Sequence, residues 1–210
     1  MTNFIDFNII EPKLQLLIDR HKEILQEYQN NQNLLEYKDF TKEQDYSIKY
    51  EHRGYPVTYQ SYFKAKHREF DKNGWHVSPL IIQGQNYSRN SEFLPILTKT
   101  LLEINLLSVC AINVLDSGIG LNWHTDKDYI PGVKLLRILW GLDVPEQDNI
   151  KSIIQIKNSD GLVETKEFKN GEFYIFHPLS EHRVENFTSQ SRSILCIDYI
   201  ADPERAFSIL

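Results

Sequence analysis

The sequence has few cysteines, no excess of positive charge and no long apolar run, and each of these shortages excludes a class of protein. Two cysteines, Cys110 and Cys196, cannot build a dense disulfide framework, and because each lies in an apolar run we expect two buried free thiols. A net charge of −6 gives no electrostatic basis for binding nucleic acid or an anionic membrane. No apolar run approaches the roughly 18 residues that span a bilayer.

The rest of the composition is that of an ordinary globular protein, with 41% apolar and 25% charged residues. The segment from Met1 to Asp6 lacks the charged and then apolar pattern of a secretory signal, so we expect a cytoplasmic protein. No drop in composition marks a linker. We therefore expect a single domain over residues 1–210, with neither nucleic acid nor membrane as a partner.

We expect the first half of the chain to contain helices and irregular segments that support the second half. Residues 11–30 predict a helix, because seven residues fall on one 3.6-residue stripe: Leu14, Leu17, Ile18, His21, Ile24, Leu25 and Tyr28. A second helix is predicted to start near Ser91 as its N-cap and to continue to Leu102. The stretch from Gln29 to Asp71 is polar, aromatic and irregular, and because it is long for a loop we expect it to contain short elements whose positions the pattern does not give.

The second half predicts a β-rich core over residues 107–203, supported by residues 1–106. Short apolar runs occur at 107–115, 133–142, 151–156, 162–168, 172–176, 182–187 and 193–200. Turn signals such as Asp160-Gly161 and Asn170-Gly171 separate them. Short strands at this spacing indicate an antiparallel sandwich or barrel.

One group of polar side chains in this half has the composition of a metal site. His124 and Asp126 are two residues apart, so in an extended segment both point to the same face. His182 would join them from another strand. Two imidazoles and one carboxylate leave three positions of an octahedral ion open, as in the facial triad of non-haem Fe(II) oxygenases. Short matches also arise by accident: Asp126 could cap a turn, and Asp128, of the same parity, could be the carboxylate instead.

Arg192 strengthens this interpretation. If the segment around Phe187 is a hairpin, His182 and Arg192 lie opposite each other and project from the same face. A buried guanidinium needs an anion, and its planar fork suits a carboxylate. A dicarboxylate such as 2-oxoglutarate could bind the metal at one end and Arg192 at the other. The alternative is an arginine paired with a nearby Asp or Glu at the rim of the β fold.

About half of the chain, residues 109–203, resembles the aspartyl/asparaginyl β-hydroxylase family. The similar segments are Asn113-Val114-Leu115-Asp116-Ser117-Gly118, Trp123-His124, Leu136-Arg137-Ile138-Leu139-Trp140-Gly141-Leu142 with Pro145, Gly171-Glu172-Phe173 to Phe176, Ser180-Glu181-His182, Asn186, Arg192, and Ile197-Asp198-Tyr199 with Pro203. The resemblance implies a mainly β protein with N-terminal helices, folded as a double-stranded β-helix (a cupin-like jelly roll) in which the helices buttress one sheet.

The resemblance also implies roles for individual residues. His124 and His182 would be iron ligands, Arg192 would bind the distal carboxylate of 2-oxoglutarate, and Arg137 and Asn113 would help to hold that co-substrate. Animal members of the family lack the carboxylate ligand, whereas Asp126 completes a His-x-Asp pair here. In this respect the sequence is similar to the bacterial proline hydroxylases of the same superfamily, which act on free amino acids.

We therefore expect a dioxygenase that depends on Fe(II), 2-oxoglutarate and O₂ and hydroxylates an amino-acid side chain. The substrate would be a free amino acid or a peptide or protein residue. The alternative is a metal-binding cupin without 2-oxoglutarate chemistry, either an isomerase or a non-catalytic binding module. Residues 40–75 and 127–133 are predicted to form the lid.

Several other side chains are expected to stay outside the chemistry. His177 has the opposite parity to His182 and should face away from the metal. His21 should pack within the helical stripe, and His52, His67 and His76 should be at the surface. Trp123 and Trp140 should lie in the core or in a pocket wall.

Overall fold

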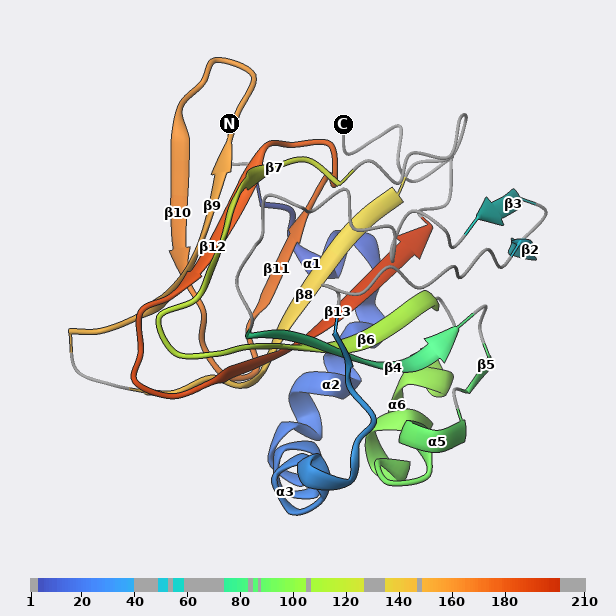
Figure 1. The fold of residues 1–210 in the computed structure, drawn as a ribbon. Coiled ribbons are helices and arrows are strands. Elements are labelled where there is room, and N and C mark those ends of the chain that lie inside the picture. The colour runs from blue at the N-terminus through green and yellow to red at the C-terminus, as the bar shows by residue number, and fades with distance from the viewer. Residues whose placement is uncertain are drawn as a thin grey trace.

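The core of the described structure is a pair of β-sheets stacked face to face, with helices on the outer face of the larger sheet (Figure 1). Its structure is a computed structural model that describes residues 4–39, 49–52, 55–58, 74–82, 85–86, 88–104, 107–126, 135–146 and 149–200. Most of the predicted lid, together with Asp128, His67 and the side chain of His52, lies outside the described residues.

Eight antiparallel strands form the jelly roll, and their bounds are β6 Leu107–Leu115, β7 Gly120–His124, β8 Leu135–Asp143, β9 Ser152–Lys157, β10 Val163–Glu167, β11 Phe173–Phe176, β12 His182–Asn186 and β13 Arg192–Ile200. The larger sheet contains β6-β13-β8-β11, and the smaller one has the order β10-β9-β12-β7. The mainly β, cupin-like fold class predicted from the sequence is confirmed. Seven of these strands agree with the predicted apolar runs to within two residues, and β7 is the one that the pattern missed.

The larger sheet continues beyond β6 with strands from the first half of the chain. β4 (Trp75–Ile82) pairs with β6, and β1 (Lys38–Asp39) and β5 (Gln85–Asn86) both pair with β4. A separate pair joins β2 (Lys49–His52) to β3 (Tyr55–Thr58). β1, β2 and β3 are short elements of the kind expected within residues 29–71, and the sequence did not give their positions because they have no regular apolar alternation.

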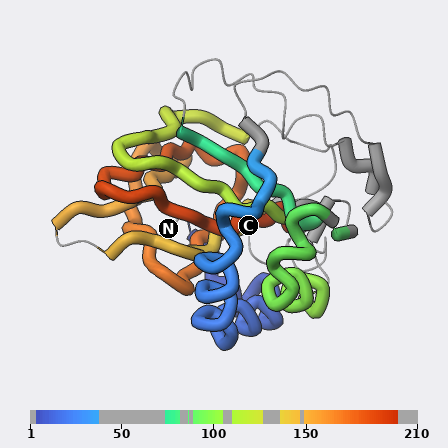
Figure 2. Tube along the Cα trace, turned by 60° about the horizontal axis from the view of Figure 1, so that its bottom comes forward, coloured from blue at the N-terminus to red at the C-terminus, as the bar shows by residue number. Residues whose placement is uncertain are grey.

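The N-terminal helices lie against the outer face of the larger sheet, on the same side as the helices that precede β6 (Figure 2). They are α1 (Phe7–Ile10), the 3₁₀ turn η1 (Pro12–Leu14), α2 (Gln15–Asp19), α3 (His21–Asn31) and the 3₁₀ turn η2 (Gln32–Leu34). The single helix predicted over 11–30 is thus broken at Arg20, where φ is −101° and ψ is 9°. Arg20 turns its side chain to the neighbouring helix, binding Thr100 at 3.0 Å and Glu103 at 3.0 Å.

The predicted N-cap at Ser91 is wrong. Ser91 ends the short helix α5 (Ser88–Ser91), and the next helix, α6 (Pro95–Ile104), starts four residues later. The carboxylate of Glu27 in α3 accepts hydrogen bonds from the backbone N–H groups of Ile96 at 2.7 Å and Leu97 at 3.0 Å. A buried anion from another helix therefore satisfies the first turn of α6, where the helix dipole favours negative charge.

The strands of the larger sheet present alternate residues to two separate cores. Leu195 and Ile197 face the helices, whereas Ile194 and Cys196 face the smaller sheet. By the same alternation, Arg192 and Asp198 belong to the inner face between the sheets. Both cysteines are buried and free, as predicted. No described helix is long and apolar enough to cross a membrane.

The predicted hairpin around Phe187 is wrong, because β12 and β13 belong to different sheets. His182 lies opposite His124 and Ile156 in the smaller sheet, and Arg192 lies opposite Leu115 in the larger one. The Asn186 side chain fixes this crossing. Its amide donates to the carbonyl oxygens of Leu115 at 2.9 Å and Gln190 at 2.8 Å, which holds the end of β12 against the larger sheet.

Candidate metal centre

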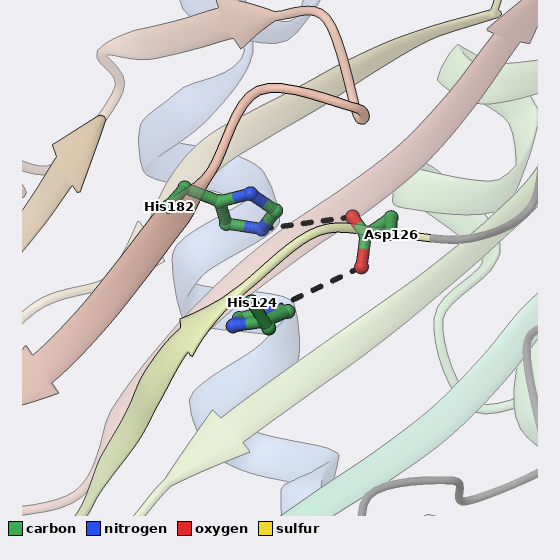
Figure 3. Close-up of side chains that lie close together, drawn as sticks. All are labelled: His124, Asp126 and His182. Atoms are coloured by element: carbon green, nitrogen blue, oxygen red, sulfur yellow. Dashed lines mark ion pairs between the residues drawn. The ribbon is translucent and has the colours of Figure 1, made fainter. Parts of the chain in front are cut away.

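Three of the predicted side chains converge at the end of the β7–β12 pair (Figure 3). His124 ends β7, Asp126 follows two residues later, and His182 begins β12 directly opposite His124. Nε2 of His124 lies 3.9 Å from Oδ1 of Asp126, and Nε2 of His182 lies 3.6 Å from Oδ2 of the same carboxylate. The three potential ligand atoms lie within 4.8 Å of one another, and no other such group occurs in the described part of the chain.

Backbone carbonyl groups set the orientation of both imidazoles. Nδ1 of His124 is 2.6 Å from the carbonyl oxygen of Asn122, and Nδ1 of His182 is 2.8 Å from that of Ser180. A carbonyl oxygen can only accept a hydrogen bond, so Nδ1 carries the proton in each ring. In this tautomer Nε2 carries the lone pair that can bind a metal ion, and a hydrogen bond at the other nitrogen is the usual support for a histidine ligand.

Burial keeps both imidazoles neutral at pH 7. It lowers the pKa of His124 to about 4, and the adjacent His182 adds to this effect. Burial also lowers the pKa of His182, although Asp126 acts in the opposite direction. A neutral imidazole is the form that binds a metal, so neither ring has to lose a proton first.

The ligand set fits a divalent transition-metal ion with open coordination positions. Two imidazole nitrogens and one carboxylate oxygen suit Fe(II) and similar ions, and no thiolate belongs to the group. The backbone N–H of Asp126 donates to the carbonyl oxygen of Pro178 at 2.9 Å, which holds the segment after β7 close to the start of β12. In Figure 3 the three side chains point toward one another from the ends of β7 and β12.

Arg137, predicted to help hold a co-substrate, lies beside this group and contacts two carboxylates. Its Nη2 is 3.2 Å from Oδ2 of Asp126, and its Nε is 2.9 Å from Oδ1 of Asp198. Nη1 also donates to Sγ of Cys196 at 3.3 Å. Asp198 was missed by sequence reasoning. The available signal was one carboxylate within the apolar run that forms β13.

Arg192 is buried on the same inner face, with 2% of its surface exposed. Its guanidinium lies 4.3 Å from the centre of the Phe168 ring. Nε and Nη1 have no hydrogen-bond partner among the described residues. Burial lowers the pKa of Arg192 to about 9, so the side chain is still charged at pH 7. The rim ion pair that would have been the simpler explanation is absent from the described structure.

Asn113 lies near Arg192 on the inner face. It is opposite Ile194 in the β6–β13 pair, which makes it a diagonal neighbour of Arg192. Its buried Oδ1 also has no partner within the described residues. Buried polar atoms are almost always hydrogen-bonded, so unpaired atoms on two neighbouring side chains indicate a place for a polar ligand.

The other polar and aromatic candidates lie elsewhere. His177 is not in the metal-capable group, and its Nδ1 accepts a hydrogen bond from the backbone N–H of Leu179 at 3.2 Å. His21 packs edge-on against the buried Trp140 ring at 5.2 Å. Trp123 was expected in the core or in a pocket wall, and the structure does not place it in the core. It is partly exposed on the smaller sheet, with Lys157 4.2 Å from its ring centre.

Comparisons with known proteins give a family and several distant structural likenesses. The family model described as aspartyl/asparaginyl beta-hydroxylase matches residues 19–202. No curated protein matches the sequence. A Pseudomonas putida prolyl-4-hydroxylase is 14% identical with a TM-score of 0.49, and the match covers 96% of this chain and 91% of that one.

In two further similar structures, the match covers only part of each of the two proteins compared. A Lactobacillus farciminis oxalate decarboxylase is 14% identical with a TM-score of 0.38, over 63% of this chain and 32% of its own. Peruvianin-I, a cysteine peptidase from Thevetia peruviana latex, is 16% identical with a TM-score of 0.40, over 64% of this chain and 66% of its own. The match thus spans less than two thirds of the length of either protein.

Proposed function

The chain belongs to the aspartyl/asparaginyl β-hydroxylase family, and on that premise we propose that it is an Fe(II)- and 2-oxoglutarate-dependent dioxygenase. The proposed substrate is an amino-acid side chain, in a free amino acid or in a peptide or protein. His124, Asp126 and His182 would hold the iron. Arg192 would bind the distal carboxylate of 2-oxoglutarate, and Asn113 lies where its amide could contribute.

The single observation that carries this proposal is the buried charge of Arg192, which the larger sheet presents to the space between the two sheets, where the metal-capable group of the smaller sheet also lies. Burying an uncompensated guanidinium is costly, and a folded protein keeps one where an anion completes the site. A monodentate metal ligand such as water would leave Arg192 without a partner. A ligand with a carboxylate at each end can serve both the metal and the guanidinium.

The balance of charge favours the same ligand. Asp126 and Asp198 carry two negative charges, and Arg137 and Arg192 carry two positive charges, so these four side chains have no net charge. Fe(II) and the dianion of 2-oxoglutarate also cancel each other. The complete site would therefore stay neutral, which is the least costly state in a low-dielectric interior.

Each group of the chain has a defined task in this reaction. Bound iron would supply the oxygen chemistry, in which 2-oxoglutarate is oxidised to succinate and CO₂ and one oxygen atom enters a C–H bond of the substrate. The carbonyl groups of Asn122 and Ser180 hold the two imidazole rings through Nδ1, so that each Nε2 would be the atom that binds the iron. The apolar side chains between the sheets, such as Ile154 and Leu139, keep water from the buried end of the site.

Succinate formation tests the proposal. The purified protein with Fe(II), ascorbate and 2-oxoglutarate should release succinate slowly alone and faster with its substrate, found by screening free amino acids and short peptides. A His182→Ala variant and a metal-free sample are the matched blanks. If neither succinate above the blanks nor 2-oxoglutarate binding is detected, while a divalent metal still binds, the chain is a metal-binding cupin of another kind and the proposal is wrong.

A further inference from the structure

Two carboxylates share one guanidinium beside the candidate metal centre. Arg137 in β8 lies between Asp126, which follows β7, and Asp198 in β13. Arg137 and Asp198 are 7% and 5% exposed, and they are direct cross-strand partners in the β8–β13 pair. Neither acid is adjacent in sequence to the arginine, so the jelly-roll topology creates this contact.

The arginine occupies one of the two oxygens of Asp126. Its Nη2 lies 3.2 Å from Oδ2, the oxygen that is also 3.6 Å from Nε2 of His182, whereas Oδ1 lies 3.9 Å from Nε2 of His124. A metal ion and a guanidinium compete for carboxylate lone pairs. With Arg137 at Oδ2, a metal would bind Asp126 through Oδ1 alone, and a one-oxygen contact keeps three of six octahedral positions open for other ligands.

We infer that Arg137 is a positioning residue that orients Asp126 for binding a metal through one oxygen, and that Asp198 holds Arg137 in place. The inference rests on the proposed metal site and deepens it. It gives Arg137 a task at the metal ligand in addition to the contact with co-substrate that the sequence resemblance implies. A planar guanidinium can hold two carboxylates in fixed directions, which an ammonium group on a flexible stem cannot do.

The decisive variant is Arg137→Lys, because it keeps the positive charge and removes only the planar guanidinium that can bind two carboxylates at once. A substitution that removes charge would alter metal affinity through Coulomb forces alone. Loss of a residue that orients a metal ligand typically weakens metal binding by about 10–100-fold. We therefore expect the dissociation constant for Mn(II) to rise by about that factor in Arg137→Lys, measured from the electron paramagnetic resonance signal of free Mn(II).

Asp198→Asn provides a second variant and an independent test. It leaves Arg137 intact but releases its anchor, so we expect weaker Mn(II) binding here as well. The matched control is Glu181→Gln, which removes one negative charge next to His182 in sequence, from an acid that pairs with Lys157 at 2.9 Å and not with Arg137. Asp198→Asn should weaken Mn(II) binding by at least about threefold more than this control. Circular dichroism would be used to check that each variant is folded.

The outcomes separate this inference from the proposal on which it rests. If the wild-type chain does not bind Mn(II), or if His182→Ala binds it equally well, the metal site itself is wrong. If wild type binds Mn(II) through His182 and Arg137→Lys binds it with unchanged affinity, the positioning role is wrong. In that case a weaker affinity for 2-oxoglutarate at saturating Mn(II) would assign Arg137 to the co-substrate. Should Arg137→Lys not fold, an Asp198→Asn affinity equal to that of the control overturns the inference.

Discussion

Replacing Arg192 with methionine should abolish tight 2-oxoglutarate binding and leave the ligand-free protein as stable as before, or more stable. Methionine fills much of the same volume and carries no charge. Removing an arginine from a core usually destabilises a fold by leaving its partner unpaired. Here Nε and Nη1 of Arg192 have no hydrogen-bond partner among the described residues, so the substitution creates no orphaned acid there.

The structure sets the size of both effects. The pKa of Arg192 is depressed to about 9 by burial, a depression that corresponds to roughly 5 kcal/mol of lost solvation. The cation–π contact between Arg192 and Phe168 offsets about 2 kcal/mol of this solvation cost. Allowing for relaxation, Arg192→Met should gain about 2 kcal/mol in the free energy of unfolding, or about 4–8 °C in Tm. Losing a desolvated guanidinium–carboxylate pair should weaken the binding free energy of 2-oxoglutarate by about 2–5 kcal/mol. Its Kd should therefore rise by a factor between about 30 and some thousands.

The assay is calorimetric titration of the Mn(II)-loaded protein with 2-oxoglutarate, beside thermal unfolding of the metal-free protein. Arg192→Lys should recover part of the affinity, because one point charge replaces a bidentate fork. Pyruvate, which lacks the distal carboxylate, should bind wild type and Arg192→Met equally. Arg183→Met is the matched control. Arg183 follows His182 in β12, but its guanidinium stacks on the partly exposed ring of Trp123. If Arg192→Met unfolds several degrees earlier and still binds 2-oxoglutarate normally, the side chain is structural and the reasoning is refuted.

Further predictions concern the ligands, pH and the helical support. His182→Ala and Asp126→Asn should each lose Mn(II) binding by paramagnetic resonance, whereas His177→Ala should keep it. Equal loss in all three would contradict the ligand assignment. The metal-free protein should become less stable as the pH falls from 6.5 to about 4, by up to about 3 kcal/mol. The unfolded chain binds a proton at His124 in this window and the folded chain does not, so denaturant titrations of His124→Gln should show a flatter pH profile. Glu27→Gln should cost about 1–3 kcal/mol of unfolding free energy by weakening the charged hydrogen bonds to α6, with no change in Mn(II) affinity. A change in affinity would show that the helices influence the site.

The strands of the jelly roll could be predicted because their apolar runs are bounded by turns with strong local signals. Gly161 and Gly171 adopt positive φ values of 79° and 74°, which residues with side chains rarely do. β7 escaped prediction because Leu121 is its single buried residue, so the strand shows no apolar alternation. Its place in the sheet comes from pairing with β12, which no local pattern encodes.

The pairing partners were the part of the fold that local sequence could not determine. A short polar link between two apolar runs is compatible with a hairpin and with a crossing between sheets. In this chain the Asn186 side chain decides the matter by bonding backbone carbonyl groups of β6 and of the link itself. Arg192 still reached the inner face, because its parity along β13 is independent of the strand's partner.

The candidate site was predictable where it depended on spacing along one strand. His124 and Asp126 converge because two-residue spacing places them on one side, and His182 meets them through the β7–β12 pair. The contacts of Arg137 were not predictable, since they depend on Asp126 and Asp198, which are 11 and 61 positions away in the sequence. Burial of Arg192 without an acid partner likewise required the three-dimensional packing.

Anaerobic addition of 2-oxoglutarate to the Fe(II)-loaded protein tests the central claim most directly. Wild type should develop the weak visible absorption that arises when a 2-keto acid binds Fe(II) through its keto and carboxylate oxygens. The band should saturate with 2-oxoglutarate, require far higher concentrations in Arg192→Met and be absent in His182→Ala. Fe(II) binding by wild type without any such band, at any 2-oxoglutarate concentration, would contradict the assignment of this chain as a 2-oxoglutarate-dependent oxygenase.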